Sequence, residues 1–381
     1  MSLKAKALLK PCLVADAKLK ILLCITGLEV GGAEKLVCAL ADQYASAGHQ
    51  VKLVCLTEPI IVRPKNRNIS LENLAMKRNP IGLLVGLRRL REMVKSFQPD
   101  IVNSHLVHAN ILTRMLRLVV PMRCLISSAH NSNEEGRARI WAYRLTDRLA
   151  DISTNVSNEA VQAFEAQGAV KPGRMIPVYN GVSTDEFRFD TALREQIREE
   201  LKISAETSLI LAVGRLWAPK DYPSLLKAMS ALKDDRSWRL AVAGDGPLRA
   251  TLEALAADLE ISERINWLGV RHDVPALMSA CDVFVLSSAW EGFGLVVAEA
   301  MACQRPVVAT DCGGVREVIG NRGSLVPPKD PVALAEAIKS ALAQPAQQNE
   351  ELGRAARKRI QERYSITATA ERYLAVYRGE Y

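Results

Sequence analysis

The stretch that decides the fold reads V-F-V-L-S-S-A-W-E-G-F-G-L-V-V-A-E-A, from Val283 to Ala300. It opens with a β-branched apolar run, Val283–Leu286, which has the composition of a buried strand. A loop with Gly292 and Gly294 follows, and an apolar run of helical length ends the stretch. A strand that passes through such a loop into a helix is the repeating unit of a parallel sheet covered by helices.

The same alternation extends over the rest of the chain. In the first half we predict strands at Lys20–Ile25, Val51–Leu56, Asp100–Ser104, Cys124–Ser128, Ile152–Val156 and Met175–Tyr179. In the second half they are Leu209–Val213, Arg239–Ala243, Ile265–Leu268, Val283–Leu286 and Val307–Ala309. Amphipathic patterns predict helices at 33–47, 83–97, 193–201, 221–232, 247–258, 294–302 and 331–343. The pattern predicts an α/β protein with two doubly wound parallel-sheet domains.

The domain boundary is placed near residue 185. The turn sequence Tyr179-Asn-Gly-Val-Ser183 has no apolar period and separates the two halves. A chain of 381 residues is long enough for two or three domains. We therefore predict an N-terminal domain at 1–185, a C-terminal domain at 186–362, and a final helix within 363–381 that packs back onto the N-terminal domain.

Composition excludes several classes of protein. With 49% apolar and 24% charged residues, the chain is neither disordered nor fibrous. No window holds 18 uninterrupted apolar residues, and Lys10 and Pro11 interrupt the first apolar stretch, so neither a membrane span nor a signal peptide is expected. The eight cysteines form no Cys-x-x-Cys pair, and we interpret them as reduced core thiols of a cytosolic protein.

Positive charge is concentrated in the first half of the chain. The formal net charge is +8. Residues 1–185 hold 25 basic and 15 acidic side chains, a net charge of +10, whereas residues 186–381 hold 25 and 27, a net charge of −2. A basic domain favours an anionic partner, such as a membrane surface, a phosphorylated lipid or a nucleic acid.

Loops at the carboxyl ends of the strands are the expected ligand sites, because ligands of open parallel sheets bind there. After the first strand, Gly31 and Gly32 lead into a helix, which fits a phosphate site or a plain tight turn. After Leu209–Val213 come Arg215 and Lys220. An arginine fork and a lysine charge can converge on one diphosphate, with a solvated loop as the alternative.

The segment from Glu291 to Glu299 carries the strongest signal. Phe293, Gly294 and Leu295 lie where the helix begins, so backbone N–H groups there can meet a phosphate. Glu299 lies inside an apolar run, where an unpaired carboxylate would be costly. It therefore needs a partner, either the two hydroxyls of a ribose or a basic side chain.

Glu291-Gly-Phe-Gly-Leu-Val-Val-Ala-Glu299, two glutamates separated by seven residues, resembles the signature of the family 4 glycosyltransferases of GT-B fold. Further parts of that pattern are Gly31-Gly-Ala-Glu34, Asn180-Gly-Val182, Gly214-Arg215 with Lys220, Gly244-Asp-Gly-Pro-Leu248 and Gly313-Gly314. The resemblance covers essentially the whole chain. It implies two Rossmann-like domains that face each other across a cleft, with the nucleotide of an NDP-sugar bound mainly by the C-terminal domain.

The resemblance assigns roles to residues of the second half. Arg215 and Lys220 would hold the diphosphate and neutralise its charge as it departs. Glu299 would bind the ribose. Glu291 and the backbone of Phe293–Leu295, Gly294 included, would meet the donor sugar and the phosphate.

It also implies contacts from three other loops. Val270 and Arg271 lie where the family contacts the base through main-chain atoms, and Gly31 and Gly32 would approach the diphosphate or the donor sugar from the first domain. One position departs from the pattern. Asp221 stands where many relatives have glycine after the lysine, which puts the local loop shape in question.

Three histidines are further candidates. His130 follows a strand and matches the family's catalytic-cleft histidine near the sugar, although a lone histidine is often structural. His105 and His108 are expected to begin a helix on the same rim and could face the acceptor, while His105 could equally cap or pack that helix.

By this resemblance the protein is a retaining hexosyltransferase. It would move a hexose or N-acetylhexosamine from a nucleotide-diphosphate sugar, most commonly a UDP-sugar, to a glycan or lipid-linked acceptor in bacterial surface polysaccharide or glycolipid synthesis. The family uses front-face attack, in which the leaving phosphate oxygen accepts the acceptor's proton, and needs no metal or other cofactor. The expected location is the cytoplasm, peripheral to the inner face of the membrane.

The helix predicted at Leu83–Phe97 gives that location a physical basis. Its cations Arg88, Arg91 and Lys95 lie away from an apolar face made by Leu83, Leu87, Leu90 and Val94. Such a helix fits either an anionic membrane surface or an ordinary solvated face.

Alternative functions remain open from the sequence. An NDP-sugar 2-epimerase or a non-catalytic GT-B scaffold subunit would share the fold, but the set Arg215, Lys220, Glu291 and Glu299 favours a transferase. A nucleic-acid partner would explain the basic half. The chain offers no helix-turn-helix, aromatic platform or zinc site for one.

Overall fold

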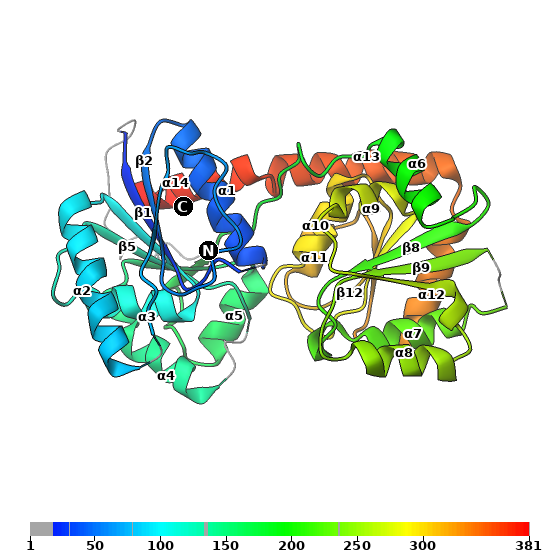
Figure 1. The fold of residues 1–381 in the computed structure, drawn as a ribbon, viewed down its shortest axis with the longest axis horizontal. Coiled ribbons are helices and arrows are strands. Elements are labelled where there is room, and N and C mark those ends of the chain that lie inside the picture. The colour runs from blue at the N-terminus through cyan, green and yellow to red at the C-terminus, as the bar shows by residue number, and fades with distance from the viewer. Residues whose placement is uncertain (1–17, 30, 78, 133–135, 235–236, 381) are drawn as a thin grey trace. The chain divides into compact units, whose positions relative to one another are not determined.

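The computed structural model describes residues 18–29, 31–77, 79–132, 136–234 and 237–380 (Figure 1). It divides into two compact units, which we call unit 1 (Met1–Gly181 with Ile366–Tyr381) and unit 2 (Val182–Ser365). From the sequence we placed the passage of the chain from the first domain to the second near residue 185, and its return to the first near residue 363. Cys12, one of the eight cysteines interpreted as core thiols, and the segment around Lys10 and Pro11, for which no signal peptide was expected, lie outside the described residues.

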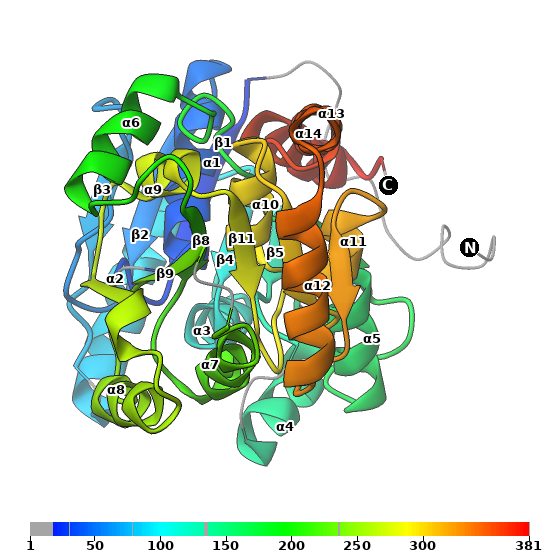
Figure 2. The same cartoon turned by 90° about the vertical axis from the view of Figure 1, so that its right-hand side faces the viewer.

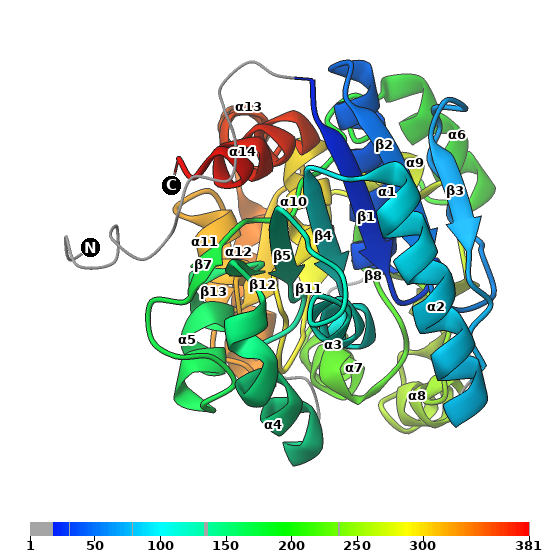
Figure 3. The same cartoon turned by 90° about the vertical axis from the view of Figure 1, so that its left-hand side faces the viewer.

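Unit 1 is built on a seven-stranded parallel sheet with the order β3-β2-β1-β4-β5-β6-β7. Figure 3 shows β5, β4, β1, β2 and β3 side by side in that row. The strands are β1 (Lys20–Ile25), β2 (Gln50–Cys55), β3 (Ser70–Asn73), β4 (Ile101–His105), β5 (Cys124–Ser128), β6 (Ile152–Asn155) and β7 (Met175–Pro177). The order reverses between β1 and β4, as in a doubly wound sheet.

Helices cover both faces of this sheet, because side chains of a strand alternate between its faces. On β1, Ile21, Leu23 and Ile25 pack with α1 and α14, whereas Leu22 and Cys24 pack toward α2 and α3 (Figure 1). The helices of unit 1 are α1 (Gly32–Ser46), α2 (Pro80–Phe97), α3 (Val107–Leu116), α4 (Arg137–Thr146), α5 (Asn158–Ala166) and α14 (Ile366–Arg378).

The last helix of the chain belongs to the core of unit 1. On α14, Tyr373, Val376 and Tyr377 are buried among residues of α1 and the sheet. The hydroxyls of Tyr377 and Tyr44 lie 3.2 Å apart, and Asn103 Nδ2 donates to Tyr377 Oη at 2.9 Å. This polar network ties the end of the chain to strand β4.

Unit 2 repeats the architecture with six parallel strands in the order β10-β9-β8-β11-β12-β13. The strands are β8 (Ser208–Val213), β9 (Trp238–Ala243), β10 (Ile265–Gly269), β11 (Val283–Leu286), β12 (Val307–Thr310) and β13 (Ser324–Val326). Helices α7 (Tyr222–Ser230), α8 (Arg249–Asp258) and α12 (Pro331–Ala343) pack on one face of the sheet (Figure 2). The order reverses between β8 and β11, and the predicted α/β class with two parallel sheets is confirmed.

The helices of unit 2 alternate with its strands. They are α6 (Thr191–Glu200), α7 (Tyr222–Ser230), α8 (Arg249–Asp258), α9 (Val274–Ala280), α10 (Leu295–Ala302), α11 (Val315–Ile319), α12 (Pro331–Ala343) and α13 (Ala346–Arg363). The sequence pattern did not reveal β3 and β13. Both are short strands at the edges of their sheets, where a continuous apolar run is not required.

Helix α2 begins earlier than the sequence predicted. Asn79 Oδ1 accepts from the Gly82 N–H at 2.7 Å, and Pro80 takes the first helical position. Leu90 and Val94 are buried, but Leu83 is 46% exposed, so the predicted apolar face of this helix is buried only in part. The reason is that the first turn of α2 extends beyond the core and exposes four apolar side chains, Ile81, Leu83, Leu84 and Val85.

Two further expectations concern the cysteines and membrane-spanning helices. The seven described cysteines are buried free thiols, as predicted for core positions. Within the described ranges, no helix combines the length and apolar character needed to cross a membrane.

Candidate active site

The strand-order reversal of unit 2 brings two of the predicted loops together. Arg215 and Lys220 follow β8, and Glu291 follows its neighbour β11. Parallel sheets bind ligands outside the carboxyl ends of the strands at such a reversal, because the flanking helices diverge there. The three charged side chains therefore lie where the fold provides a site.

Lys220 and Glu291 form an ion pair in this place. Lys220 Nζ lies 2.6 Å from Glu291 Oε1, with the two side chains 19% and 15% exposed. Ser288 Oγ donates to the same Glu291 oxygen at 2.7 Å. Two bonds join the loops: Ser287 Oγ donates to the Lys220 carbonyl at 2.8 Å, and the Ala289 N–H to the Pro219 carbonyl at 2.8 Å. Glu291 thus holds the Lys220 ammonium, and the two backbone carbonyl contacts hold the loops together.

Arg215 is exposed on the loop after β8. Its guanidinium lies 5.3 Å from the centroid of the Trp217 ring. Within the described part of the chain we find no hydrogen bond or ion pair to this side chain. Its charge is therefore not neutralised by a carboxylate and is available to an anionic ligand.

The loop after Lys220 keeps the shape that glycine would give it. Asp221 has φ 44° and ψ 47°, in the left-handed region that glycine adopts most easily and aspartate tolerates. Ser224 Oγ donates to Asp221 Oδ2 at 2.7 Å. The departure at Asp221 thus leaves the turn into α7 intact.

Glu291 is fixed from behind by close backbone packing. Gly313 has φ +56°, and a Cβ there would lie 1.9 Å from the Glu291 carbonyl oxygen. The Gly314 N–H also donates to the Gly292 carbonyl at 3.2 Å. Burial, together with the negative charge of Glu291, raises the pKa of Tyr222, whose hydroxyl donates to the Gly214 carbonyl. Sequence reasoning gave Gly313 no role, because its neighbour Glu291 lies on another loop, and it also missed the hydrogen bonds of Ser288 and Tyr222 within their own loops.

The predicted phosphate-binding helix is α10. Gly294 precedes it in the left-handed region, with φ 84°, and Leu295 is its first residue. Phe293 is buried, with its ring 5.7 Å from that of Tyr364, so only its backbone can meet a ligand. Glu299 lies inside α10 and is 7% exposed. The start of the helix presents N–H groups toward which anions are attracted.

The predicted base-binding loop follows β10. The Val270 side chain is exposed, whereas the Arg271 guanidinium is bound by two carboxylates. It bonds to Asp273 at 2.6 and 2.7 Å and to Glu200 at 2.6 and 3.2 Å. These bonds raise the pKa of Arg271 and lower the pKa values of both carboxyls. The Arg271 guanidinium is therefore already occupied, and main-chain atoms of this loop are left for a base, which is the kind of contact that the resemblance implies.

In unit 1 the loop after β1 leads into α1 through Gly31 and Gly32. Gly31 is the N-cap residue in an extended conformation, and Gly32 starts the helix. The Glu34 carboxylate folds back over Gly31, since a Cβ on Gly31 would lie next to Glu34 Oε2. Burial raises the pKa of Glu34, and a hydrogen bond from its own backbone N–H lowers it in part. An acidic side chain therefore already occupies the amino end of α1.

The histidines of unit 1 are arranged differently from the prediction. His105 is the last residue of β4, and the helix begins after it at Val107. His105 is fully buried and cannot face an acceptor, so that expectation was wrong: parallel pairing with Ser128 keeps it in the sheet. Its Nδ1 lies 3.1 Å from His130 Nε2. His108 lies on α3 and is exposed.

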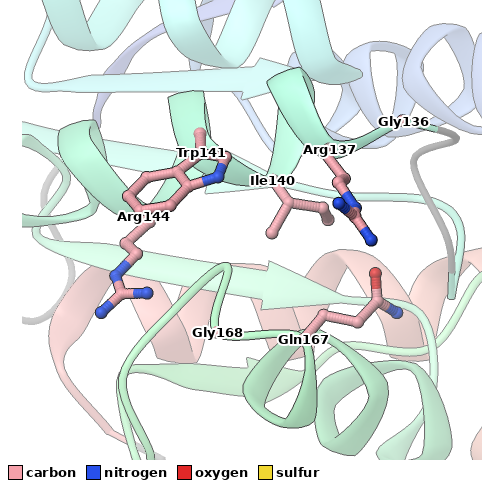
Figure 4. Close-up of a pocket in the computed structure, with 7 residues that line it drawn as sticks. All are labelled: Gly136, Arg137, Ile140, Trp141, Arg144, Gln167 and Gly168. Carbon is pink, nitrogen blue, oxygen red and sulfur yellow. The ribbon is translucent and has the colours of Figure 1, made fainter.

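A cavity of about 460 Å³ opens elsewhere on unit 1, beside α4 (Figure 4). Trp141 is 55% exposed there, and the Arg144 guanidinium lies 5.3 Å from its ring centroid. The lining residues are Gly136, Arg137, Ile140, Trp141, Arg144, Gln167 and Gly168. None of the predicted site residues is among them, so this cavity is separate from the predicted donor site.

Two family models match the chain, one in each half. Residues 30–186 match the model described as Glycosyltransferase Family 4, and residues 194–359 match the model described as Glycosyl transferases group 1. The chain belongs to the family 4 glycosyltransferases. The glycosyltransferase is 25% identical over 364 residues to the N-acetyl-alpha-D-glucosaminyl L-malate synthase of Bacillus anthracis, an alignment that covers 91% of this chain and 94% of the relative.

Another relative and a solved structure extend this finding. The UDP-Gal:alpha-D-GlcNAc-diphosphoundecaprenol alpha-1,3-galactosyltransferase of Escherichia coli is 26% identical over 270 residues, which cover 67% of this chain and 66% of the relative. The crystal structure of Anabaena HepE in complex with UDP and glucose superposes with a TM-score of 0.81 at 20% identity, covering 94% of this chain and 99% of that one. The fold is GT-B, and the chain is a glycosyltransferase enzyme that acts in glycoconjugate synthesis.

Proposed function

We propose that this glycosyltransferase transfers a hexose or N-acetylhexosamine from a UDP-sugar to a glycan or lipid-linked acceptor, with retention of anomeric configuration. The observation that carries the proposal is the clustering of charge at the strand-order reversal of unit 2. Arg215 and Lys220 follow β8, Glu291 follows β11, and α10 starts just beyond it. This is the arrangement that a departing diphosphate requires.

The division of roles follows from the contacts. Arg215 has no carboxylate partner in the described ranges and offers a planar fork to phosphate oxygens. Lys220 is held by Glu291, so its ammonium is positioned in advance, and Glu291 retains its second oxygen for a sugar hydroxyl. The start of α10 adds backbone N–H groups. Glu299, inside the same helix, would accept from the ribose hydroxyls.

The proposed reaction needs no protein nucleophile. The bond between the anomeric carbon and the leaving phosphate oxygen breaks while the acceptor oxygen bonds to the same face of that carbon. The acceptor's proton passes to the departing phosphate oxygen, so charge and atoms balance. The protein stabilises the charge that develops on the diphosphate, and this stabilisation is the main source of rate enhancement in such sites. No metal or other cofactor is assigned a role.

The donor and acceptor classes rest on the relatives. The Escherichia coli relative takes UDP-Gal and a diphosphoundecaprenol-linked sugar, according to its name, and Anabaena HepE was crystallised with UDP. Both support a uridine nucleotide, and the first supports an acceptor carried on a lipid. We therefore place the enzyme in surface polysaccharide or glycolipid synthesis, with no nucleic-acid partner.

A lipid-linked acceptor also accounts for the basic first half of the chain. Helix α2 exposes Ile81 and Leu84 in its first turns, and Arg91 and Lys95 are exposed farther along. Arg88 is exposed as well and pairs with Glu92 at 3.0 Å. Apolar side chains next to cations suit the interface of an anionic membrane, where each cation contributes about 1 kcal/mol. We propose peripheral attachment at the cytoplasmic face of the membrane.

A donor screen tests the proposed function. Thermal unfolding is measured with UDP-, GDP- and ADP-sugars, and the stabilising donor is then incubated with lipid-linked and soluble glycans while the anomeric configuration of the product is read by NMR. The expected result is stabilisation by a UDP-sugar and a retained linkage. Stabilisation by no NDP-sugar would support the scaffold alternative, and epimerisation of the donor without an acceptor would support the epimerase.

A further inference from the structure

Helix α4 is rotated in unit 1 so that its tryptophan, Trp141, faces outward. The neighbouring Tyr143 fixes this rotation, because its ring lies 5.4 Å from the Phe164 ring and its hydroxyl accepts from Asn110 Nδ2 at 2.9 Å. Tyr143 is buried, whereas Trp141 is 55% exposed. Residues two positions apart point to different sides of a helix, so the contacts that bury Tyr143 hold the Trp141 ring at the surface.

The outward side of α4 forms one wall of the cavity in Figure 4. Arg137, Trp141 and Arg144 are spaced by four and three residues, so they share this side of the helix. Gln167 and Gly168, at the end of α5, line the other wall. A Cβ on Gly168 would lie 3.8 Å from Arg144 Nη1, so the guanidinium lies close to that wall. The volume of about 460 Å³ falls within the range of small-molecule sites, about 300 to 1,000 Å³.

The cavity carries two positive charges that no carboxylate neutralises. Among the described residues, neither Arg137 nor Arg144 forms an ion pair or a hydrogen bond, and both side chains are exposed. The Arg144 guanidinium lies 5.3 Å from the centroid of the Trp141 ring, a contact that orders the ring and keeps the charge. An arginine fork binds a planar anion such as a carboxylate through two parallel hydrogen bonds. The cavity therefore favours a ligand with an anionic group.

Gln167 adds a hydrogen-bond acceptor beside these cations. Its Nε2 donates to the Ser132 carbonyl at 3.2 Å, which leaves the amide oxygen for the cavity. Figure 4 shows this oxygen pointing toward the Arg137 guanidinium. An acceptor in this place repels the oxygens of a phosphate, but it suits a ligand whose hydroxyl donors stand next to a carboxylate. That combination is found in an acidic sugar.

The exposed indole ring supplies the third part of a sugar site. The face of an aromatic ring is apolar and carries partial negative charge. It therefore attracts the C–H groups on one side of a pyranose ring. A flat ring beside a cation and an acceptor matches a hexuronate, which has an apolar ring face, a carboxylate and several hydroxyls.

We propose that this cavity is a second carbohydrate site, which binds a saccharide containing a hexuronate. Arg137 binds the carboxylate, the Gln167 amide oxygen accepts from a hydroxyl, and Trp141 packs against the sugar ring. None of these residues belongs to the donor site of unit 2. The use of the site, to hold part of an acidic acceptor chain, rests on the proposed function, whereas the binding of the saccharide does not.

Calorimetry with two acidic probes, trigalacturonate and a hyaluronan tetrasaccharide, tests the site. Maltotriose is the control without charge, and inorganic phosphate is the control without a sugar ring. At least one acidic probe is expected to bind, and both controls should bind at least tenfold more weakly, because each lacks one of the two groups. Binding of neither acidic probe, or equal affinity for phosphate, would overturn the proposal.

Indole ¹H–¹⁵N NMR signals of the five tryptophans locate the bound saccharide. The Trp141 signal, assigned with Trp141→Phe, is expected to shift with the acidic probe. Signals of Trp217 and Trp290, which neighbour the donor-site residues in the sequence, should not shift. A shift of these two alone would place the saccharide in the donor site. A Trp141 shift with vesicles of anionic lipid but with neither acidic probe would assign this face to a membrane. Both results would overturn the proposal.

Variants separate the cavity from general charge attraction. Arg137→Met should weaken binding of the acidic probe at least tenfold, and Trp141→Ala about two- to tenfold. Arg148→Met removes the same charge at an exposed position that does not line the cavity, so it should bind as the wild type does. All three side chains are exposed, so equal melting temperatures are expected. Equal losses in Arg137→Met and Arg148→Met would overturn the proposal.

Failure of this site and failure of the proposed function give different results. Binding of the acidic probe by an enzyme that turns over no NDP-sugar would refute the proposed function and leave the second site in place. Turnover of an NDP-sugar without binding of either acidic probe would refute the second site alone.

Discussion

Replacement of Lys220 by methionine removes the ammonium that joins the two loops of the predicted donor site. Among the described residues, the Glu291 carboxylate would then keep only the hydrogen bond from Ser288 at 2.7 Å. Removal of one partner of a fully buried pair costs about 3 to 5 kcal/mol. Because the two side chains are 19% and 15% exposed and Ser288 remains, we expect a smaller loss of about 1 to 2 kcal/mol in the free energy of unfolding.

The same variant should lose activity for a second reason. A charged hydrogen bond to the diphosphate contributes about 1.5 to 3 kcal/mol, so kcat/KM for the donor should fall about 10- to 150-fold. The assay combines urea unfolding with donor turnover. The double variant Lys220→Met/Glu291→Gln separates the effects, since it removes the unpaired charge and should regain stability without regaining activity.

Lys227→Met is a matched control, because Lys227 is exposed on the neighbouring helix α7. Lys227→Met should change neither the free energy of unfolding nor kcat/KM for the donor. Lys220→Met with at least half of the wild-type kcat/KM would refute the assignment of Lys220 to the diphosphate. Equal stability of the single and double variants would refute the energetic importance of the pair.

Three further outcomes are expected. The pKa of His130 is about 4 in the folded protein and 6.5 in the unfolded chain, so the contribution of its neutral form to stability is complete above pH 6.5 and is lost as the pH falls from 6.5 toward 4. At pH 5 the loss in the free energy of unfolding is about 2 kcal/mol. In urea unfolding, the stability of His130→Gln should therefore decline less steeply with falling pH than that of the wild type, and an identical slope would contradict this. Gly313→Ala should lower the free energy of unfolding by more than about 2 kcal/mol and remove most activity, because its Cβ would overlap the Glu291 carbonyl. The control Gly173→Ala, at φ +78° with no atom within 4 Å of the added Cβ, should lower it by only about 1 kcal/mol. Equal effects of the two variants on stability would contradict the packing argument. In vesicle flotation the enzyme should bind membranes with anionic lipid and not neutral ones, and the Ile81→Ser/Leu84→Ser variant should bind less; equal absence from both fractions would reject attachment.

Local sequence patterns predicted most of the fold. Strands such as Lys20–Ile25 and Val283–Leu286 have the predicted bounds, because buried parallel strands are continuous apolar runs. Edge strands such as β3 lack that signal. Leu106 was the main local error, since its unusual φ of 71° ends β4 before the helix begins and cannot be read from a leucine in the sequence.

Contacts between distant residues were harder to predict. The residue types at Lys220 and Glu291 indicated a charged site, but their ion pair joins positions 71 residues apart and depends on β8 and β11 being neighbours. The His105–His130 bond likewise depends on the register of β4 with β5. The spacing of residues in the sequence identified candidate site residues. Which of them contact each other could be known only once the order of the strands in the sheet was known.

Nucleotide binding by Arg215 and Glu299 is the central claim, and calorimetry with the nucleoside diphosphate of the stabilising donor tests it most directly. Arg215→Ala and Glu299→Gln should each weaken binding at least tenfold, because each removes a charged hydrogen bond of about 1.5 to 3 kcal/mol. Arg322→Ala, at an exposed position of unit 2, should bind as the wild type does. Unchanged affinity in both site variants, with melting temperatures equal to that of the wild type, would contradict the account.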